Sequence, residues 1–202
     1  MLKIKFYFDK IILGMSFKAK FIHLHVHSDY SLLDGAAKIS DIISKAKKCN
    51  MSHIALTDHG NLFGAIKFYK EAKKAGIKPI IGIEAYMAKT SKFFKKHDDL
   101  GKMSYHLILL AKNEIGYKNL LKLTSISYLE GFYYRPRIDK EDLEKYSEGL
   151  ICTSACIGGL IPRLILANRF EDAKNEILWF KKFLATIFIL SFKGMVLKIK
   201  TL

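Results

Sequence analysis

Short apolar runs recur along the chain with the two-residue alternation of strands. FIHLHV, from Phe21 to Val26, alternates large residues and predicts the first strand. Four later runs predict further strands: HIALTD, KPIIGIEAYMA, HLILLA and GLICTS. A polar and basic stretch from Lys89 to Lys102 predicts an exposed loop between the third strand and the fourth.

Between these runs, apolar residues recur with the 3.6-residue period of helices. Ile39, Ile42, Ile43 and Ala46 fall at i, i+3, i+4 and i+7, so they predict one buried helical face. A second helical face is predicted at Leu62, Ala65, Ile66, Tyr69 and Ala72, with Gly76 as its stop, and further helices from Ile115 to Leu129 and up to about Leu184.

Strands and helices that alternate in this order indicate an α/β fold with parallel strands and crossover helices. Periodicity alone leaves two architectures open, a barrel and a doubly wound sheet. In both, functional side chains gather at the carboxyl ends of the strands.

Net charge and cysteine content bear on the partners of the protein and on its cellular compartment. The 202 residues carry a formal net charge of +15, which favours polyanionic partners such as DNA. Nearly all basic residues are lysines, so an AT-rich coding bias explains the charge equally well. Three cysteines form no disulfide framework and suit a reducing cytoplasm. The apolar run FLATIFILSF is shorter than the roughly 20 residues of a membrane helix, so no membrane partner is expected.

Three histidines, His23, His25 and His27, occupy alternate positions in the first predicted strand. The two-residue period places their imidazoles on one face. Packing explains three buried imidazoles poorly, because each needs a polar partner. A divalent metal ion would supply one, since neutral imidazole is a common metal ligand.

Further candidate ligands recur at the ends or inner faces of later strands. Asp58 and His59 end the second strand, although a turn with a capping Asp explains them alone. Glu84 lies amid apolar residues, where an unpaired carboxylate is costly. His106 opens the fourth strand and Cys156 follows the fifth. Jointly they predict a metal site assembled from distant segments.

Long stretches of the chain resemble a known family. HLHVHSDYSLLDG and ALTDHGNLFGAIKFYKEAKKAGIKPIIGIEAY resemble the polymerase and histidinol phosphatase (PHP) domain. HLILLAKNEIGYKNLLKLTSISYLEGFYYRPRID and GLICTSACIGGLIPRLI resemble, within that superfamily, the version that opens the alpha subunit of bacterial DNA polymerase III. The similarity runs from about Phe17 to about Leu184.

The resemblance implies an incomplete, distorted barrel of the (β/α)7 type with up to three divalent ions, zinc, manganese or magnesium. The catalytic residues that it implies would act through bound metal; they are His25, His27, His59 and Glu84. Asp58 would orient His59 without binding the metal itself. The ligand set carried over from the family is His25, His27, Asp34, His59, Glu84, His106 and Cys156. Asp34 is followed by Gly35, so a simple turn competes with its role as a ligand. His23 precedes the motif and is not expected to be a direct ligand.

The same resemblance implies hydrolysis of phosphoesters, of the 3′–5′ exonuclease type on DNA, within a DNA-directed DNA polymerase and its holoenzyme subunits. Two alternatives remain: a free-standing phosphoesterase and a non-catalytic structural module. The long matches favour the polymerase subunit over the first alternative, and the retained histidines weigh against the second.

Three segments are expected: a non-homologous extension (1–16), an incomplete PHP domain (17–184) and an atypical tail (185–202) that resembles a shifted reading frame. The family takes its last ligands from an Asp-x-His motif, whereas neither Asp nor His follows Glu176. No palm domain is present either. We therefore expect no polymerisation and impaired hydrolysis by this chain.

Overall fold

The computed structural model describes residues 21–183, 188–192 and 195–198, so the predicted extension (1–16) lies outside the described residues. One sheet runs in the order β1 (His53–Leu56), β2 (Lys78–Met87), β3 (Tyr105–Ala111), β5 (Leu150–Thr153), β6 (Phe188–Phe192) and β7 (Met195–Lys198), and β4 (Arg137–Ile138) pairs with β2. The helices are α2 (Ile39–Lys48), α3 (Ala65–Lys74), α4 (Glu114–Leu129), α5 (Lys140–Tyr146), α6 (Leu160–Leu166) and α7 (Phe170–Phe183).

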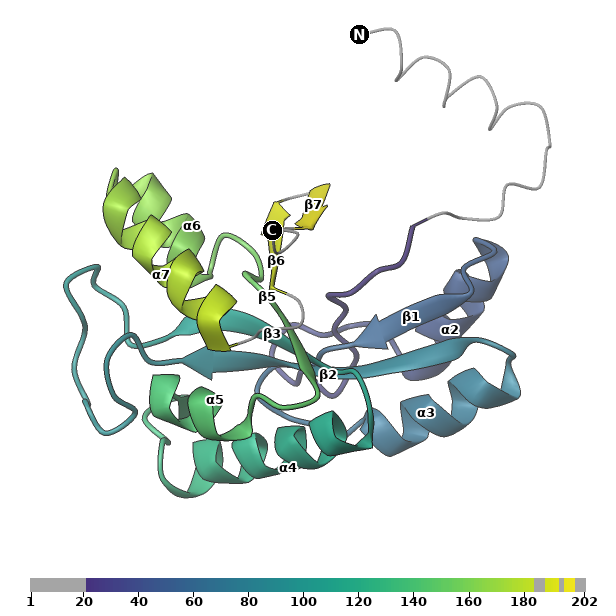
Figure 1. The fold of residues 1–202 in the computed structure, drawn as a ribbon. Helices are drawn as coiled ribbons and strands as arrows, with labels where there is room; N and C mark the ends of the chain where they lie inside the picture. Colours follow the sequence, from purple (N-terminus) through teal and green to yellow (C-terminus); the bar gives the residue numbers. More distant parts are fainter. Residues whose placement is uncertain (1–20, 184–187, 193–194, 199–202) are drawn as a thin grey trace, which may run out of the picture.

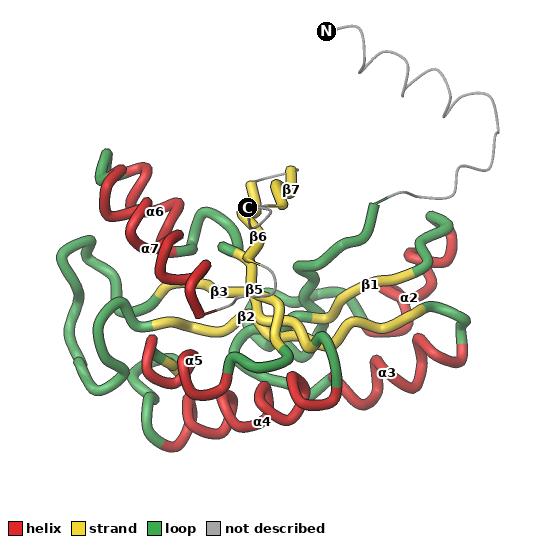
Figure 2. Tube along the Cα trace, in the orientation of Figure 1, coloured by secondary structure: helices red, strands yellow, loops and turns green. Residues whose placement is uncertain are grey.

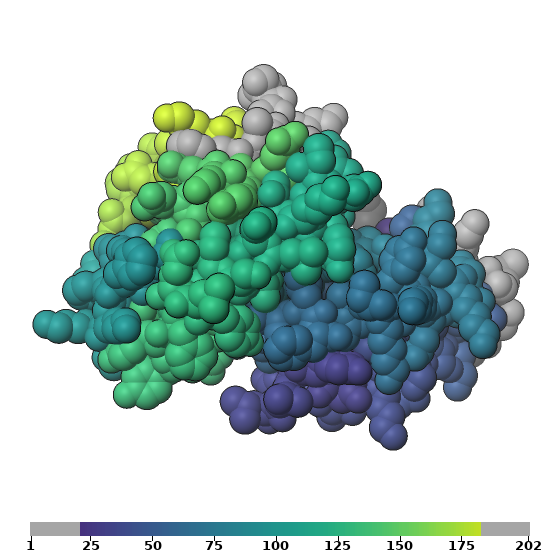
Figure 3. Space-filling view, turned by 90° about the horizontal axis from the view of Figure 1, so that it is seen from below, coloured from purple at the N-terminus to yellow at the C-terminus, as the bar shows by residue number. Residues whose placement is uncertain are grey.

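The helices cover the sheet on two sides (Figure 1). α3, α4 and α5 lie along one side of the sheet, and α6 and α7 lie together on the other (Figure 2). Figure 3 views the first side, with α3 in blue beside the teal and green surface of α4 and α5. None of the helices that the structure describes is long and apolar enough to cross a bilayer.

β3 runs antiparallel to both of its neighbours, β2 and β5. The prediction of parallel strands throughout is therefore wrong at this position, although β1 with β2 and β5 with β6 are parallel. The cause is the connection from β2 to β3, residues 88–104, which contains no crossover helix, so the chain returns antiparallel. As a result the start of β3 lies beside the carboxyl ends of β2 and β5.

The first predicted strand, Phe21 to Val26, is not a strand in the structure. It lies beside β1, where Ala55 N donates to His23 O at 3.0 Å and Thr57 N donates to Val26 O at 2.8 Å. The two acceptors, His23 and Val26, are three residues apart, whereas the two donors in and after β1 are two residues apart. The first segment therefore contains one extra residue, as at a β-bulge. The regular ladder is interrupted for this reason.

The helix predictions are confirmed, with one change of face. In α2 all four predicted residues, Ile39, Ile42, Ile43 and Ala46, are buried. In α3 the predicted face is partly wrong, since Ala65, Phe68 and Ala72 are the buried residues while Ile66 and Tyr69 are exposed. Phe68 fills the core between α2 and β1, which rotates the helix away from the expected side. Gly76 stops the helix with φ +76°, as predicted.

The sheet is open among the described residues, because its path begins at β1 and ends at β7. The α/β class is confirmed, and an open sheet of this kind fits the incomplete barrel that the resemblance implies. Within the predicted tail (185–202), β6 extends the sheet beside β5 and β7 turns back antiparallel to it. The other tail residues lie outside those described.

The two faces of β2 and β3 differ in chemistry. Ile83, Ala85 and Leu109 join the apolar core beneath α4. Because side chains alternate across a strand, Glu84 and His106 point to the opposite face, away from α4. Glu84 and His106 thereby share one face of the sheet.

Candidate metal centre

Glu84 lies at the centre of a cluster of histidines. Its side chain is 1% exposed. Two hydrogen bonds join its backbone to the residues that follow β1: Glu84 N donates to Asp58 O at 3.1 Å, and Gly60 N donates to Glu84 O at 2.9 Å. This pairing places His59 directly beside Glu84. A carboxylate buried this deeply requires polar partners.

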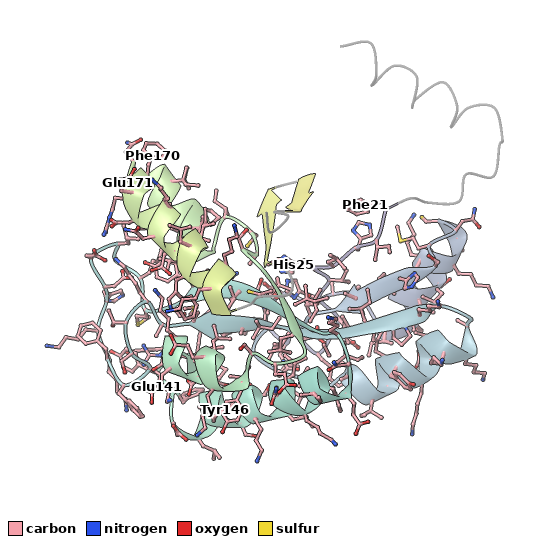
Figure 4. The ribbon with its side chains drawn as sticks, viewed as in Figure 1. Phe21, His25, Glu141, Tyr146, Phe170 and Glu171 are labelled. Atoms are coloured by element: carbon pink, nitrogen blue, oxygen red, sulfur yellow. The ribbon has the colours of Figure 1, made fainter. Side chains whose placement is uncertain are left out.

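Four imidazoles surround the Glu84 carboxylate. Nε2 of His25 is 2.7 Å from Oε2, and Nδ1 of His59 is 2.6 Å from Oε1. Nδ1 of His106 is 3.1 Å from Oε1, while Nε2 of His27 is 3.8 Å from Oε2. The structure therefore brings the five residues into one cluster. Figure 4 labels His25 on the side of the sheet away from α4.

His106 and Cys156 approach each other because β3 is antiparallel to β5. Sγ of Cys156 lies 3.6 Å from Nδ1 of His106. The loop after β5 is closed by His106 N, which donates to Gly158 O at 3.0 Å. A Cβ at Gly158 would lie 2.9 Å from His106 Nδ1, so a side chain there would displace the imidazole.

Asp34 reaches the cluster from an exposed turn. Its carboxylate oxygens lie 3.0 and 3.1 Å from Nε2 of His59. The turn depends on Gly35, because a Cβ there would lie 1.8 Å from the carbonyl oxygen of Ser28. Asp34 therefore lies in a turn and beside His59, and its role as a ligand stays a prediction.

Asp58 acts on His59 less directly than the resemblance implies. Its carboxylate accepts hydrogen bonds from Ser28 N at 2.6 Å and from Ser31 Oγ at 2.8 Å. Ser31 Oγ in turn accepts from His59 N at 3.1 Å. Asp58 therefore fixes the backbone of His59 through Ser31, whereas Glu84 and Asp34 hold its ring.

The remaining histidines lie apart from the cluster. His23 is exposed and its ring is 4.9 Å from that of Phe21. His53, at the start of β1, contacts Ser52 Oγ at 2.8 Å. Of the three alternate histidines, His25 and His27 therefore join the cluster and His23 does not.

Hydrogen bonding sets the protonation of Glu84 and His106. Burial alone would raise the pKa of the Glu84 carboxyl, but hydrogen bonds from His106, His25 and His59 outweigh it and hold that pKa far below its usual value. Burial opposes the charged form of His106, yet its contacts with Cys156 and Glu84 raise its pKa to about 9. The contact with His106 also lowers the pKa of the Cys156 thiol.

The surroundings of His27 and His59 shift their pKa values in opposite directions. Burial and the neighbouring His59, whose ring stacks on it at 4.0 Å, lower the pKa of His27. The hydrogen bond to Glu84 instead raises the pKa of His59. Nδ1 of His27 is buried and has no hydrogen-bond partner among the described residues. A buried nitrogen without a partner is the kind of atom that a bound ion or water satisfies.

Two groups of side chains have the spacing to hold a metal ion. The first is His25, His27 and Glu84, and the second is Glu84, His106 and Cys156, with ligand atoms within 4.8 Å of one another in each. Glu84 belongs to both groups and has two carboxylate oxygens. The donor set of imidazole, thiolate and carboxylate fits a divalent transition-metal ion.

A cavity of about 400 Å³ opens beside the second group. Arg135 is one of its lining residues. Tyr86 holds the guanidinium of Arg135, since Nη1 donates to Tyr86 Oη at 2.7 Å and the guanidinium lies 4.7 Å from the ring centre of Tyr86. The lining residues are Lys102, Met103, Ser104, His106, Tyr133, Tyr134, Arg135, Cys156, Ile157, Gly158 and Arg163. Apart from His106 and Cys156, these residues were not predicted as site residues, although Arg135 and Arg163 lie in stretches that resemble the family.

Comparison with known proteins shows the family of the chain. The chain belongs to the PHP domain family, whose model matches residues 23–192. It is 93% identical over 176 residues to the DNA polymerase III subunit alpha of Borreliella burgdorferi, which covers 87% of this chain and 15% of that protein. It is 50% identical to the subunit of the same name from Treponema pallidum, over 79% of this chain and 14% of that protein.

The chain thus spans about 15% of the length of these curated relatives. Among solved structures, a two-domain protein from Bacteroides vulgatus, described as containing a predicted PHP-like metal-dependent phosphoesterase, is 14% identical, with a TM-score of 0.44 over 83% of this chain and 50% of that one.

Proposed function

We propose that this chain is a metal-dependent phosphoesterase module of a bacterial replicative DNA polymerase, and that it hydrolyses the terminal phosphodiester of a DNA 3′ end. The observation that carries the proposal is the convergence of four histidines on the buried carboxylate of Glu84. Such a cluster has little value for packing, whereas phosphoester hydrolysis needs closely spaced cations.

His25, His27 and Glu84 would hold one ion, and Glu84, His106 and Cys156 a second, while Asp34 and His59 complete the site. Thiolate and imidazole donors favour zinc, with manganese next and magnesium least. Bound ions would neutralise charge on the phosphoryl oxygens and lower the pKa of a bound water. The chain's own residues supply orientation, since Glu84 fixes His25 and His59 in place.

The wider setting follows from the relatives. They are DNA polymerase III alpha subunits, so we propose DNA and other holoenzyme subunits as partners and the cytoplasm as the location. Nucleotide incorporation would belong to parts of that protein beyond these residues. We retain the division into an extension (1–16), a PHP domain (17–184) and an atypical tail (185–202) as part of the proposal.

Cleavage of an end-labelled single-stranded oligonucleotide, with and without added zinc or manganese, tests the activity. We expect slow, metal-dependent release of 3′ nucleotides, because the Asp-x-His ligands of the family are absent from the sequence. His27→Ala should abolish release. His53→Ala is the matched control and should leave it unchanged, because His53 contacts Ser52 rather than the cluster.

Equal cleavage by the His27→Ala variant and the wild type would show that the activity comes from a contaminant or another site. Cleavage that resists chelation would also contradict the proposal.

A further inference from the structure

The cavity beside His106 and Cys156 is basic and is not explained by metal binding. Lys102, Arg135 and Arg163 line it, and none of the described residues that line it is acidic. It shares His106 and Cys156 with the second metal-binding group. Any molecule in the cavity therefore lies next to the proposed reaction centre and meets positive charge.

The four arginines of the chain divide into two kinds. Arg137 donates to backbone carbonyls, including those of Gly131 and Phe94, and Arg169 pairs with Asp99 and Asp172. Both guanidinium groups therefore already have acceptors within the fold.

Arg135 and Arg163, by contrast, have no carboxylate partner among the described residues. Nε of Arg163 is buried and makes no hydrogen bond to any described residue. A buried guanidinium nitrogen without an acceptor is costly, so it indicates an anion that the cavity accommodates. Arg135 is held by Tyr86, whose ring lies 5.5 Å from that of His106.

Tyr134 stands at the rim of the same cavity. Its side chain is 74% exposed, and its backbone has φ +58°, a left-handed conformation that is unfavourable for a residue other than glycine. Strain of this kind persists where the surrounding structure imposes it, and it concentrates at ligand sites. The conformation presents an open aromatic ring next to Arg135.

We propose that Lys102, Tyr134, Arg135 and Arg163 form a binding site for the end of single-stranded DNA. The guanidinium groups bind the phosphodiester beside the metal centre, in the paired geometry that arginine offers phosphate. Tyr134 stacks on the adjoining base. The proposal rests on the proposed function, because it names the residues that bind the same substrate.

Binding of a fluorescein-labelled oligothymidine, followed by fluorescence anisotropy in the presence of a chelator, tests the phosphate contacts without hydrolysis. For single strands, log K falls with log salt by about 0.7 for each phosphate neutralised. Arg163→Gln should flatten that slope by about this amount. Lys122→Gln, at an exposed position of α4, removes the same charge and should leave the slope unchanged. Equal slopes for all three proteins would overturn the assignment of Arg163.

The stacking role is tested at Tyr134. Tyr134→Leu should weaken binding about fivefold to a hundredfold, whereas Tyr134→Phe should bind like the wild type, because each stacked base contributes through the ring alone. Circular dichroism of the two variants separates loss of binding from loss of folding. Equal binding by the Leu and Phe variants would refute stacking, and tighter binding of oligouridine than of oligothymidine would refute DNA as the ligand.

Binding and cleavage can fail separately. If the variants lose binding but the wild type cleaves nothing, the DNA-end site stands and the proposed hydrolysis fails. If the wild type cleaves and Arg163→Gln changes neither binding nor KM, the hydrolysis stands and this site fails.

Discussion

Replacement of Arg137 by methionine should destabilise the fold near the cavity. The guanidinium is 1% exposed and donates to the carbonyls of Gly131, Lys92, Phe94 and Met103. Methionine keeps the apolar stem but donates to none of them. Lys92 and Gly131 stay buried, and each carbonyl left without a donor costs about 1–3 kcal/mol, so the free energy of unfolding should fall by about 2–6 kcal/mol.

Urea unfolding followed by fluorescence of the single tryptophan, Trp179, measures this change. The control is Arg169→Gln, which breaks ion pairs with Asp99 and Asp172 at the surface and should change stability much less. If the free energy of unfolding of Arg137→Met stayed within about 0.5 kcal/mol of the wild type, the reasoning from buried carbonyls would be refuted.

Three other outcomes are expected. Gly116→Ala should prevent stable folding, seen as loss of the cooperative urea transition, because its Cβ would lie 1.9 Å from the carbonyl oxygen of Gly149. Burial and the hydrogen bond to Asp98 raise the pKa of Tyr105, so its contribution to stability is present below an unfolded pKa of about 10 and is lost as pH rises above it. Between about pH 9 and 11, the urea midpoint of the Tyr105→Phe variant should therefore fall less than the midpoint of the wild type does. Zinc at about a hundredfold its Kd should stabilise the wild type by about 2.7 kcal/mol, and Cys156→Ser should reduce that gain in thermal melts.

The sequence predicted the elements better than their directions. Period-two runs located β1, β2, β3 and β5, and the spacing of Ile39 and Ala46 located α2. The reversal of β3 was missed, because direction depends on whether a crossover helix exists and not on the pattern within a strand. β4 and α5 were also missed, since two and seven residues carry too little periodicity to register.

The candidate site was foreseeable where residue types are unusual for their surroundings. Glu84 amid apolar residues and the alternate histidines pointed to one cluster. The structure brings Glu84 together with His25 and His27 but leaves His23 outside, and the roles of these residues as ligands stay a prediction. Ser31 and Arg163 could not be foreseen. A serine near a turn and an arginine on a helix are ordinary in sequence. The role of Ser31 comes from partners 27 and 28 residues away, and that of Arg163 from a buried nitrogen that has no partner among the described residues.

The most direct test of the metal centre is zinc binding by Glu84→Gln, measured by competition with a chromophoric chelator. Glutamine keeps the size of the side chain but removes the carboxylate shared by both metal-binding groups. The matched control is Glu114→Gln, which alters an exposed ion pair with Lys118 on α4. The account predicts that Glu84→Gln weakens zinc binding by more than about a hundredfold while Glu114→Gln binds like the wild type. Zinc binding by a folded Glu84→Gln variant within about twofold of the wild type would contradict it.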